Sequence, residues 1–281
     1  MIVALNGKLV PEEQALVSVF DRGLLYGDGL FEAVRIFNGK PFRWEQHEAR
    51  FRQGAAFLGI KVPEQPGGLR ALADELVTRN QLPNCLLRIL LTRGTGPRGY
   101  SPKGADRPTL AMSLHPAPER PQDVVAWSLV TSSVRLPANE PLANFKTCNK
   151  LAQILARTQA DAAGANEALL LNTDGLVVEG SSSNLFWVEN DGEVKTPPLA
   201  AGILAGVTRA AIIELCRASG LKVGEGETTP ERLRRSEGVF VSLTSAGVAE
   251  ATEIDGHRLQ RSPAVARLHT AYWDLLNSEC A

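Results

Sequence analysis

Two residues of this chain, Lys146 and Glu179, could together support the chemistry of an aldehyde cofactor. Lys146 follows an irregular stretch, and Glu179 ends an apolar segment, residues 176–179, that is predicted to be a strand. A lysine amine can form a Schiff base with pyridoxal phosphate, and a carboxylate can keep the pyridine nitrogen of that cofactor protonated. The spacing alone is weak support, because most lysines are exposed loop residues and most strand-end carboxylates face solvent.

The neighbours of both residues strengthen this hypothesis. Lys146 lies among apolar and amide side chains such as Asn144 and Phe145, which favours a partly buried amine with a lowered pKa. In strict strand alternation Glu179 shares a face with Val177 and so points inward, where a carboxylate needs a cationic partner.

A glycine-containing loop, residues 202–206, leads into a helix predicted at residues 207–219. The first N–H groups of a helix have no partner inside the helix, and its positive end attracts anions. Together with the Thr208 hydroxyl they could bind a phosphate. The ordinary alternative is a loop in which Thr208 only caps the helix.

Three further residues could add phosphate ligands. Thr244 and Ser245 follow a strand predicted at residues 239–243 and could donate hydroxyl hydrogen bonds, although an ordinary polar turn explains them equally well. Arg50 lies on a predicted helix, where an arginine is usually a surface residue. It becomes a phosphate ligand only if its neighbours place it there.

The composition is that of an ordinary globular protein. Hydrophobic residues make up 44% and charged residues 22%, the formal net charge is −1, and no basic run is long enough to indicate nucleic acid. The N-terminus does not resemble a signal peptide, and no apolar segment approaches the roughly 20 residues of a membrane span. We therefore expect no nucleic-acid partner and no membrane association.

Cysteines and histidines give no sign of a metal site. The four cysteines have no paired spacing, and the four histidines have no metal-ligand spacing. Scattered single cysteines favour reduced thiols over disulfides. We therefore expect a cytoplasmic protein without a metal ion.

The chain of 281 residues is long enough for two domains. Residues 115–121 contain three prolines, which neither a helix nor a central strand tolerates. We predict an N-terminal domain at residues 1–117, a linker at 118–123 and a C-terminal domain at 124–281.

Strands and helices are mixed without strict alternation, which predicts an α+β architecture. The pair Asn6-Gly7 predicts a hairpin between residues 2–5 and 8–10. Hydrophobic periodicity predicts helices at residues 43–58, 69–80, 149–163 and 207–219, and strands at residues 30–37, 86–92, 109–114, 124–132, 168–172, 176–179, 185–188 and 239–243.

Seven ordered motifs resemble those of the fold-type IV, or class IV aminotransferase, family of pyridoxal-phosphate enzymes. They lie at residues 21–32, 47–50, 91–94, 145–149, 167–171, 179–186 and 202–209. The family includes D-amino-acid and branched-chain aminotransferases and 4-amino-4-deoxychorismate lyase. The resemblance implies a smaller N-terminal α/β domain, a C-terminal pseudo-barrel domain that binds the cofactor, and a homodimer with each site capped by a loop of the neighbouring subunit.

Carried over to matching positions, the resemblance implies roles for individual side chains. Lys146 would be the Schiff-base lysine that also transfers the substrate proton, and Glu179 would pair with the pyridine nitrogen. The other cofactor-binding residues would be Arg50, Ser182, Asn184, Val207, Thr208, Thr244 and Ser245. The substrate-binding residues would be Phe31, Arg35, Arg98 and Tyr100.

The activity implied is transfer of an amino group between an amino acid or amine and a 2-oxo acid. The alternative is a 4-amino-4-deoxychorismate lyase that releases 4-aminobenzoate and pyruvate. A third possibility is a non-catalytic vitamin B6 carrier, but binding alone does not require both Lys146 and Glu179.

The glycine-rich segment at residues 93–100 bears on the choice of substrate. Its Arg98 and Tyr100 could bind a substrate carboxylate across a subunit boundary, although a mobile surface loop is an equally simple interpretation. The Arg-Gly-Tyr sequence there resembles deoxychorismate lyases more than the Arg-x-His of D-amino-acid enzymes. Phe31 also lacks the hydroxyl of D-amino-acid enzymes, and Leu151 stands where branched-chain enzymes carry a tyrosine.

Overall fold

The computed structural model describes residues 1–281, which divide into two compact units. Unit 1 contains Met1–Pro118, Phe145–Asn149 and Leu276–Ala281, and unit 2 contains Glu119–Asn144 and Lys150–Leu275. The short segment with Lys146 therefore belongs to the mostly N-terminal unit, whereas Glu179 belongs to unit 2.

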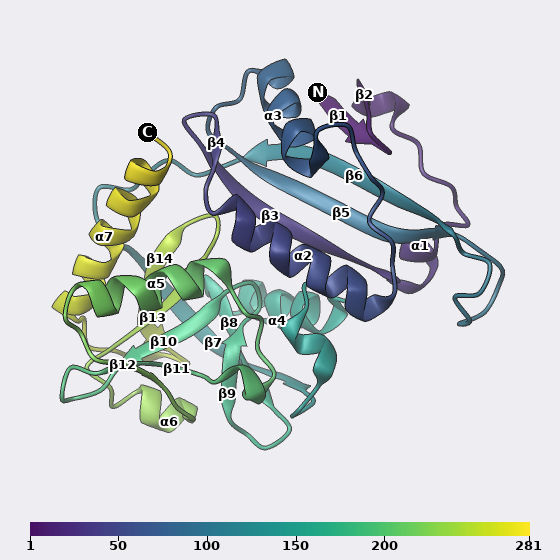
Figure 1. Cartoon of the computed structure of the whole chain (residues 1–281). Helices are drawn as coiled ribbons and strands as arrows, with labels where there is room; N and C mark the ends of the chain where they lie inside the picture. Colours follow the sequence, from purple (N-terminus) through teal and green to yellow (C-terminus); the bar gives the residue numbers. More distant parts are fainter. The chain divides into compact units, whose positions relative to one another are not determined.

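Unit 1 is built on an antiparallel sheet with the strand order β2-β1-β6-β5-β3-β4 (Figure 1). Its strands are β1 (Ile2–Leu5), β2 (Lys8–Pro11), β3 (Gly29–Phe37), β4 (Lys40–Pro41), β5 (Cys85–Thr95) and β6 (Arg107–Pro116). The predicted hairpin is confirmed: Asn6 and Gly7 adopt φ values of 50° and 80°, which the tight turn between β1 and β2 requires.

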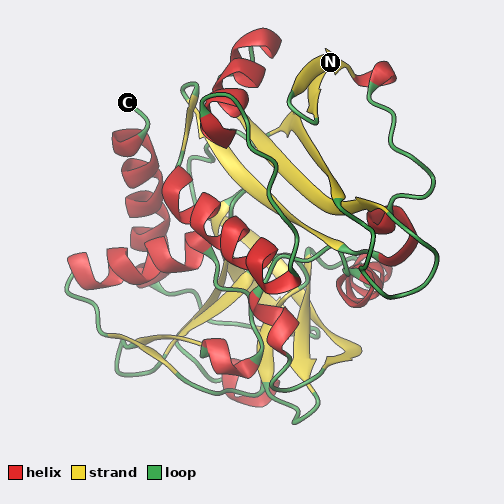
Figure 2. Cartoon of the chain, turned by 45° about the vertical axis from the view of Figure 1, so that its right-hand side comes forward, coloured by secondary structure: helices red, strands yellow, loops and turns green.

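Two helices, α2 (Trp44–Leu58) and α3 (Gly68–Asn80), cover one face of this sheet (Figure 2). Strand alternation directs Leu30 and Val34 of β3 toward them, where they join Phe51 and Leu69 in one apolar core. Helix α2 ends at Gly59, whose φ of 63° allows the left-handed turn that stops a helix. Unit 1 also contains the short elements η1 (Glu12–Gln14) and α1 (Arg22–Tyr26).

Unit 2 contains a sheet that closes on itself. The strand order is β12-β11-β10-β13-β14-β7-β8-β9, and β9 also pairs with β10, so that the strands from β10 to β9 form a ring. The strands are β7 (Val125–Leu136), β8 (Glu167–Asn172), β9 (Val177–Gly180), β10 (Asn184–Val188), β11 (Val194–Thr196), β12 (Val223–Glu225), β13 (Gly238–Leu243), β14 (Gly247–Ile254) and β15 (His257–Arg258), which pairs with β14.

Alternating residues of β8 serve two separate apolar clusters in unit 2. Leu169 and Leu171 pack with Val241, whereas Leu170 packs with Ala160 of helix α4 (Leu151–Ala162). The remaining helical elements are η2 (Pro141–Asn144), α4 (Leu151–Ala162), η3 (Leu199–Ala201), α5 (Val207–Ala218), α6 (Pro230–Leu233) and α7 (Pro263–Glu279). The predicted α+β fold with a barrel-like sheet is confirmed. None of the helices is both long and apolar enough to cross a membrane.

Candidate active site

In unit 1, backbone hydrogen bonds fix the segment around Lys146 against strand β3. Phe31 N–H donates to the Lys146 carbonyl at 2.8 Å, and Cys148 N–H donates to the Gly29 carbonyl at 2.9 Å. The Lys146 side chain is half-buried, as expected, and its Nζ lies 4.8 Å from the centre of the Phe31 ring. The predicted nucleophile and one predicted substrate residue are therefore neighbours.

Helix α2 supports this segment from a second side. Phe57 stacks on Phe145, the residue before Lys146, with ring centres 4.5 Å apart. The helix comes close because it carries Gly54, where an added Cβ would lie 2.9 Å from Leu30. The backbone of Lys146 is therefore fixed by both the strand and the helix.

The same helix brings Arg50 to a buried carboxylate that sequence reasoning missed. Arg50 Nε and Nη2 each donate to Glu32 at 2.7 Å, and His47 Nδ1 lies 2.9 Å from Glu32 Oε2. Glu32 is 1% exposed and lies on the helix-facing side of β3. The motif at residues 47–50 predicted a role only for Arg50, and neither Glu32 nor His47 was singled out.

The protonation states of this group follow from its surroundings. Burial opposes the ionisation of Glu32, but the charge of Arg50 and the hydrogen bonds from His47 and Arg50 outweigh it and lower the Glu32 pKa to about 2. Burial also lowers the pKa of His47, and the positive charges of Arg50 and Lys146 lower it further against the opposing pull of Glu32. At neutral pH a neutral His47 therefore donates its Nδ1–H to an ionised Glu32.

The other face of β3 carries Phe31, and a second cation lies over its ring. The guanidinium of Arg88 on β5 is 4.0 Å from the ring centre, and the register pairs Arg88 with Ala33 and Phe31 with Leu90, which places them on one face. Sequence reasoning missed Arg88, although its place between the apolar residues of β5 was a usable signal.

The remaining predicted substrate residues of unit 1 lie in different environments. Arg35 is 2% exposed, and its Nη2 donates to the Pro118 carbonyl at 2.9 Å. Arg98 and Tyr100 are exposed on the loop between β5 and β6, and Tyr100 is 87% exposed. Unit 1 thus brings Phe31 beside Lys146 but gives Arg35 a partner in the backbone.

In unit 2, Glu179 is half-buried and is bonded to the loop that precedes helix α5. Its Oε2 accepts a hydrogen bond from Leu204 N–H at 3.0 Å, and Asn184 Nδ2 donates to the Leu204 carbonyl at 3.0 Å. Asn184 is also the strand partner of Glu179. Two predicted cofactor residues therefore hold one loop residue between them.

The expected orientation of Glu179 was wrong. A bulge between β8 and β9 pairs Leu171 with Val177 but Leu170 with Glu179. The extra residue reverses the alternation, so Glu179 and Val177 lie on opposite faces of the sheet. Sequence alternation cannot reveal such a bulge, because it assumes that every residue has one partner across the strand.

The start of helix α5 has the features of an anion site. Gly206 is the N-cap, no side chain caps the helix, and no acidic residue occupies its first turn. Val207 and Thr208 form that first turn and are each 6% exposed. An added Cβ at Gly206 would lie 2.0 Å from Asn184 Oδ1, so only glycine allows this approach of the loop.

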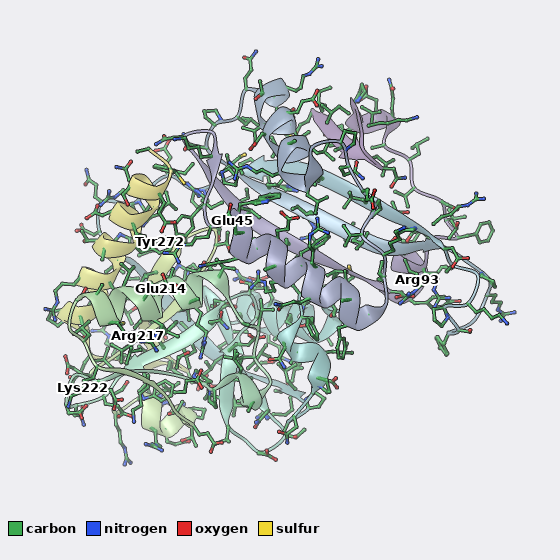
Figure 3. All side chains as sticks on the ribbon, in the orientation of Figure 1. Glu45, Arg93, Glu214, Arg217, Lys222 and Tyr272 are labelled. Atoms are coloured by element: carbon green, nitrogen blue, oxygen red, sulfur yellow. The ribbon has the colours of Figure 1, made fainter.

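The two other predicted phosphate residues of unit 2 lie in a tight turn. Thr244 and Ser245 are half-buried in the connection between β13 and β14. The turn closes at Gly247, which has a φ of 69° and whose added Cβ would lie 2.5 Å from the Tyr272 ring. Tyr272, labelled in Figure 3, therefore supports the turn from helix α7.

A second buried carboxylate, also missed from the sequence, organises the serine run after Glu179. Glu167 is fully buried and accepts hydrogen bonds from the hydroxyls of Ser181, Ser182 and Ser183. It also accepts the backbone N–H groups of Ser181 and Ser182. The predicted cofactor residue Ser182 therefore donates its hydroxyl proton to Glu167.

The residues of both units fit pyridoxal phosphate, the cofactor that the motifs imply. Unit 1 supplies an amine beside an aromatic ring and a guanidinium held by a carboxylate. Unit 2 supplies a carboxylate on β9 that is hydrogen-bonded to the loop leading into the uncapped start of helix α5. No group of three or more His, Cys, Asp or Glu is placed to hold a metal ion.

Comparison with known proteins decides the family. The family model for amino-transferase class IV matches residues 29–254. The chain is 37% identical over 256 residues to a branched-chain-amino-acid aminotransferase of Methanocaldococcus jannaschii, covering 91% of this chain and 88% of the relative. It is 32% identical over 286 residues to a D-alanine aminotransferase of Bacillus licheniformis, and the match covers 100% of this chain and 99% of the relative.

The chain belongs to the class IV aminotransferase family.

Solved structures agree with this assignment. The T.th. branched-chain amino acid aminotransferase, solved with pyridoxamine 5'-phosphate, superposes with a TM-score of 0.91 at 31% identity, over 97% of this chain and 93% of that chain. The 4-amino-4-deoxychorismate lyase of Pseudomonas aeruginosa gives a TM-score of 0.84 at 31% identity, over 97% of this chain and 98% of that chain. Class IV aminotransferases are pyridoxal-phosphate enzymes that act on small molecules. As a member of this family, the present chain is a transaminase.

Proposed function

We propose that this class IV aminotransferase binds pyridoxal 5'-phosphate with Lys146 as the Schiff-base residue and Glu179 as the partner of the pyridine nitrogen, and that it transfers amino groups between amino acids and 2-oxo acids. One observation carries the proposal. Glu179 on β9 accepts the backbone N–H of Leu204, which lies in the loop that leads to the uncapped start of helix α5. A partner for the pyridine nitrogen and a site for the phosphate would therefore be connected through one loop. Such a loop suits a ligand with a ring nitrogen at one end and a phosphate at the other.

When bound, pyridoxal phosphate supplies an aldehyde that condenses with amines and a ring that accepts electron density. Lys146 would hold that aldehyde and accept the substrate α-proton on its Nζ. Its backbone is fixed by Phe31 and Cys148 on either side, so only the side chain needs to move. The centre of the Phe31 ring lies 4.8 Å from the Lys146 Nζ.

Glu179 would hold a proton on the pyridine nitrogen. One of its oxygens already accepts the Leu204 N–H, which fixes the orientation of the carboxylate. Asn184 secures Leu204 from its carbonyl side. Ser182 would line the same region, with its hydroxyl oriented by Glu167.

The phosphate would lie at the start of helix α5. Val207 and Thr208 would donate their backbone N–H groups there, and Thr244 and Ser245 would add donors from the neighbouring turn. Arg50 would contribute positive charge from unit 1, in an orientation fixed by Glu32.

The substrate would be an anion. The guanidinium of Arg88 lies 4.0 Å from the centre of the Phe31 ring, which Lys146 also approaches, and its positive charge would attract an anionic substrate. Arg98 and Tyr100 would complete carboxylate recognition. Arg35, whose Nη2 donates to the Pro118 carbonyl, would be a further substrate residue.

A homodimer is part of the proposal. Unit 1 exposes Leu16, Val17, Val19, Phe20, Leu24 and Leu25, and unit 2 exposes Leu151, Ile154 and Leu155 on helix α4. Contiguous exposed apolar residues of this kind mark protein interfaces. We propose a second copy of the chain as the partner, and the four free cysteines fit a cytoplasmic protein.

The test replaces Lys146 with alanine and compares it with Lys61→Ala, which alters an exposed lysine. Lys146→Ala should abolish the visible absorption of the cofactor–protein Schiff base, and Lys61→Ala should preserve it. Glu179→Gln should retain the absorption but lose most of the rate of the amino-donor half-reaction. An unchanged spectrum in Lys146→Ala would refute the assignment.

A second candidate activity is the lyase reaction on 4-amino-4-deoxychorismate. The Arg98-Gly99-Tyr100 sequence and the similarity to the Pseudomonas aeruginosa lyase favour it. Incubation with 4-amino-4-deoxychorismate and analysis for 4-aminobenzoate and pyruvate tests it. A screen of both enantiomers of common amino donors with 2-oxo acids, followed by the change in cofactor spectrum, tests the transaminase.

A further inference from the structure

The exposed loop with Arg98 and Tyr100, residues 96–106, is anchored from within unit 1 by a buried arginine. Arg22 is 3% exposed. Its Nη1 donates to the carbonyls of Gly99 at 2.8 Å and Ser101 at 3.3 Å, and its Nη2 donates to the carbonyl of Tyr100 at 3.1 Å. One guanidinium therefore binds three consecutive backbone carbonyls of this loop, which we call the Arg98 loop.

Two further contacts join helix α1 to the same loop. Tyr26 OH accepts a hydrogen bond from Gly99 N–H at 3.1 Å, and the Tyr26 and Tyr100 rings meet edge to face at 5.6 Å. At the base of the loop, an added Cβ at Gly96 would lie 3.2 Å from Arg22 Cδ. The loop is therefore packed on the arginine as well as bonded to it.

Arg22 itself is held rigidly. Its Nε donates to the Asp28 carboxylate at 2.8 Å, and this ion pair fixes the guanidinium from its other side. The preceding residue, Asp21, caps helix α1 through Gly23 N–H and accepts the hydroxyls of Thr92 and Thr109. The backbone and the guanidinium of Arg22 therefore both have fixed positions.

Arg93 (labelled in Figure 3) provides a natural comparison. It shares the Asp28 carboxylate at 2.8 Å, but its remaining donors bind the carbonyls of Leu58 and Gly59. The two arginines thus have the same charge partner, and only Arg22 contacts the Arg98 loop.

We propose that Arg22 is a positioning residue for substrate recognition, holding the Arg98 loop in the conformation that presents Arg98 and Tyr100 to a substrate carboxylate. The inference rests on the proposed function, which gives this loop its role in substrate binding. A loop that is ordered beforehand binds its ligand without the entropy loss of becoming ordered. Arginine is required because lysine cannot reach three separate carbonyls with one planar group.

The first test measures loop order without reference to activity. Trypsin cleaves after Arg98 and Lys103, which are both exposed. In the cofactor-loaded enzyme, Arg22→Lys should be cleaved at these two sites at least about tenfold faster than the wild type. Arg93→Lys is the matched control and should leave the cleavage rate in the loop within about twofold. Peptide masses identify the sites, and urea unfolding confirms that each variant is folded.

The second test separates substrate binding from chemistry and cofactor binding. Arg22→Lys should raise the KM for the 2-oxo acid about tenfold, with kcat reduced much less and the cofactor Kd unchanged. Because Arg22 acts through the loop, the loss caused by Arg98→Ala should be much smaller in the Arg22→Lys background than in the wild type. Two independent effects would instead multiply.

A milder variant keeps the proposal testable if Arg22→Lys does not fold. Tyr26→Phe removes only the acceptor for Gly99 N–H, and it should raise both loop cleavage and KM about threefold. If Arg22→Lys folds and leaves both loop cleavage and the KM unchanged, the inference is overturned. If only Tyr26→Phe folds, the same result in that variant overturns it.

The failure of the proposed substrate role has a different signature. If Arg98→Ala leaves the KM unchanged while Arg22→Lys still accelerates cleavage, Arg22 orders the loop but the loop does not bind substrate. If Arg98→Ala raises the KM and Arg22→Lys changes neither measurement, only the positioning role of Arg22 is wrong.

Discussion

Glu32→Gln is the change whose effect is most directly determined by the structure. Glu32 is buried between the side chains of Arg50 and His47 and accepts hydrogen bonds from both. Glutamine has nearly the same shape but carries no charge. The substitution therefore leaves the Arg50 guanidinium, 11% exposed, without its counter-ion.

The magnitude follows from the Glu32 pKa, which is about 2 in the folded protein against an ordinary value of 4.5. Each tenfold change in proton affinity corresponds to about 1.4 kcal/mol, so the ionised carboxylate contributes about 3 kcal/mol to the free energy of unfolding at neutral pH. This agrees with the roughly 3–5 kcal/mol expected when one partner of a buried ion pair is removed. We expect Glu32→Gln to lose about 3 kcal/mol at pH 7.

The pH dependence has a definite sign. Because the folded pKa lies below the unfolded one, the contribution of Glu32 is complete above pH 4.5 and is lost as the pH falls toward 2. The difference in unfolding free energy between wild type and variant should therefore stay constant from pH 7 to about pH 5 and then shrink. Urea unfolding of both cofactor-free proteins at a series of pH values measures it.

Glu75→Gln is the control, because Glu75 forms an exposed pair with Arg79 at 3.5 Å. Its effect should stay within about 0.5 kcal/mol at every pH. If Glu32→Gln were as stable as the wild type at pH 7, or if the difference did not change between pH 5 and pH 3, the assignment of an ionised, stabilising Glu32 would be wrong.

Three other predictions concern unit 2 and the thiols. Glu167→Gln should destabilise the protein by about 2 kcal/mol in urea unfolding, because a glutamine cannot accept all the serine hydrogen bonds; unchanged stability would contradict this. Gly206→Ala should raise the cofactor Kd at least about tenfold, because the added Cβ would displace the Asn184 side chain. A fluorescence titration measures this Kd, and an unaltered value would exclude phosphate binding by this loop. Burial raises the pKa of Cys85 and of Cys216 to about 11. A thiol reagent at pH 8 should therefore leave both cysteines unmodified in the native protein and label them in urea. Rapid labelling of the native protein would show that they are not buried.

Much of the fold was predictable because its signals are local. Apolar periodicity predicted helices α2, α3, α4 and α5 to within a few residues. Asn6-Gly7 predicted the first hairpin, because few other pairs tolerate positive φ at both positions. The order of the motifs predicted the family, since many short patterns in one sequence order are unlikely to arise by chance.

The sequence by itself also determined which residue types could perform the chemistry, with Lys146 and Glu179 as the principal pair. Only the tertiary structure showed how such residues are held. Glu32 on β3 forms an ion pair with Arg50 on helix α2, and Arg22 donates to carbonyls more than seventy residues away in the sequence. Glu167 accepts hydrogen bonds from three serines in a later turn. Hydrogen bonds and ion pairs between distant segments depend on where the whole chain brings them, so no local pattern records them. The bulge that turns Glu179 to the opposite face is of the same kind, because it arises from pairing with a neighbouring strand.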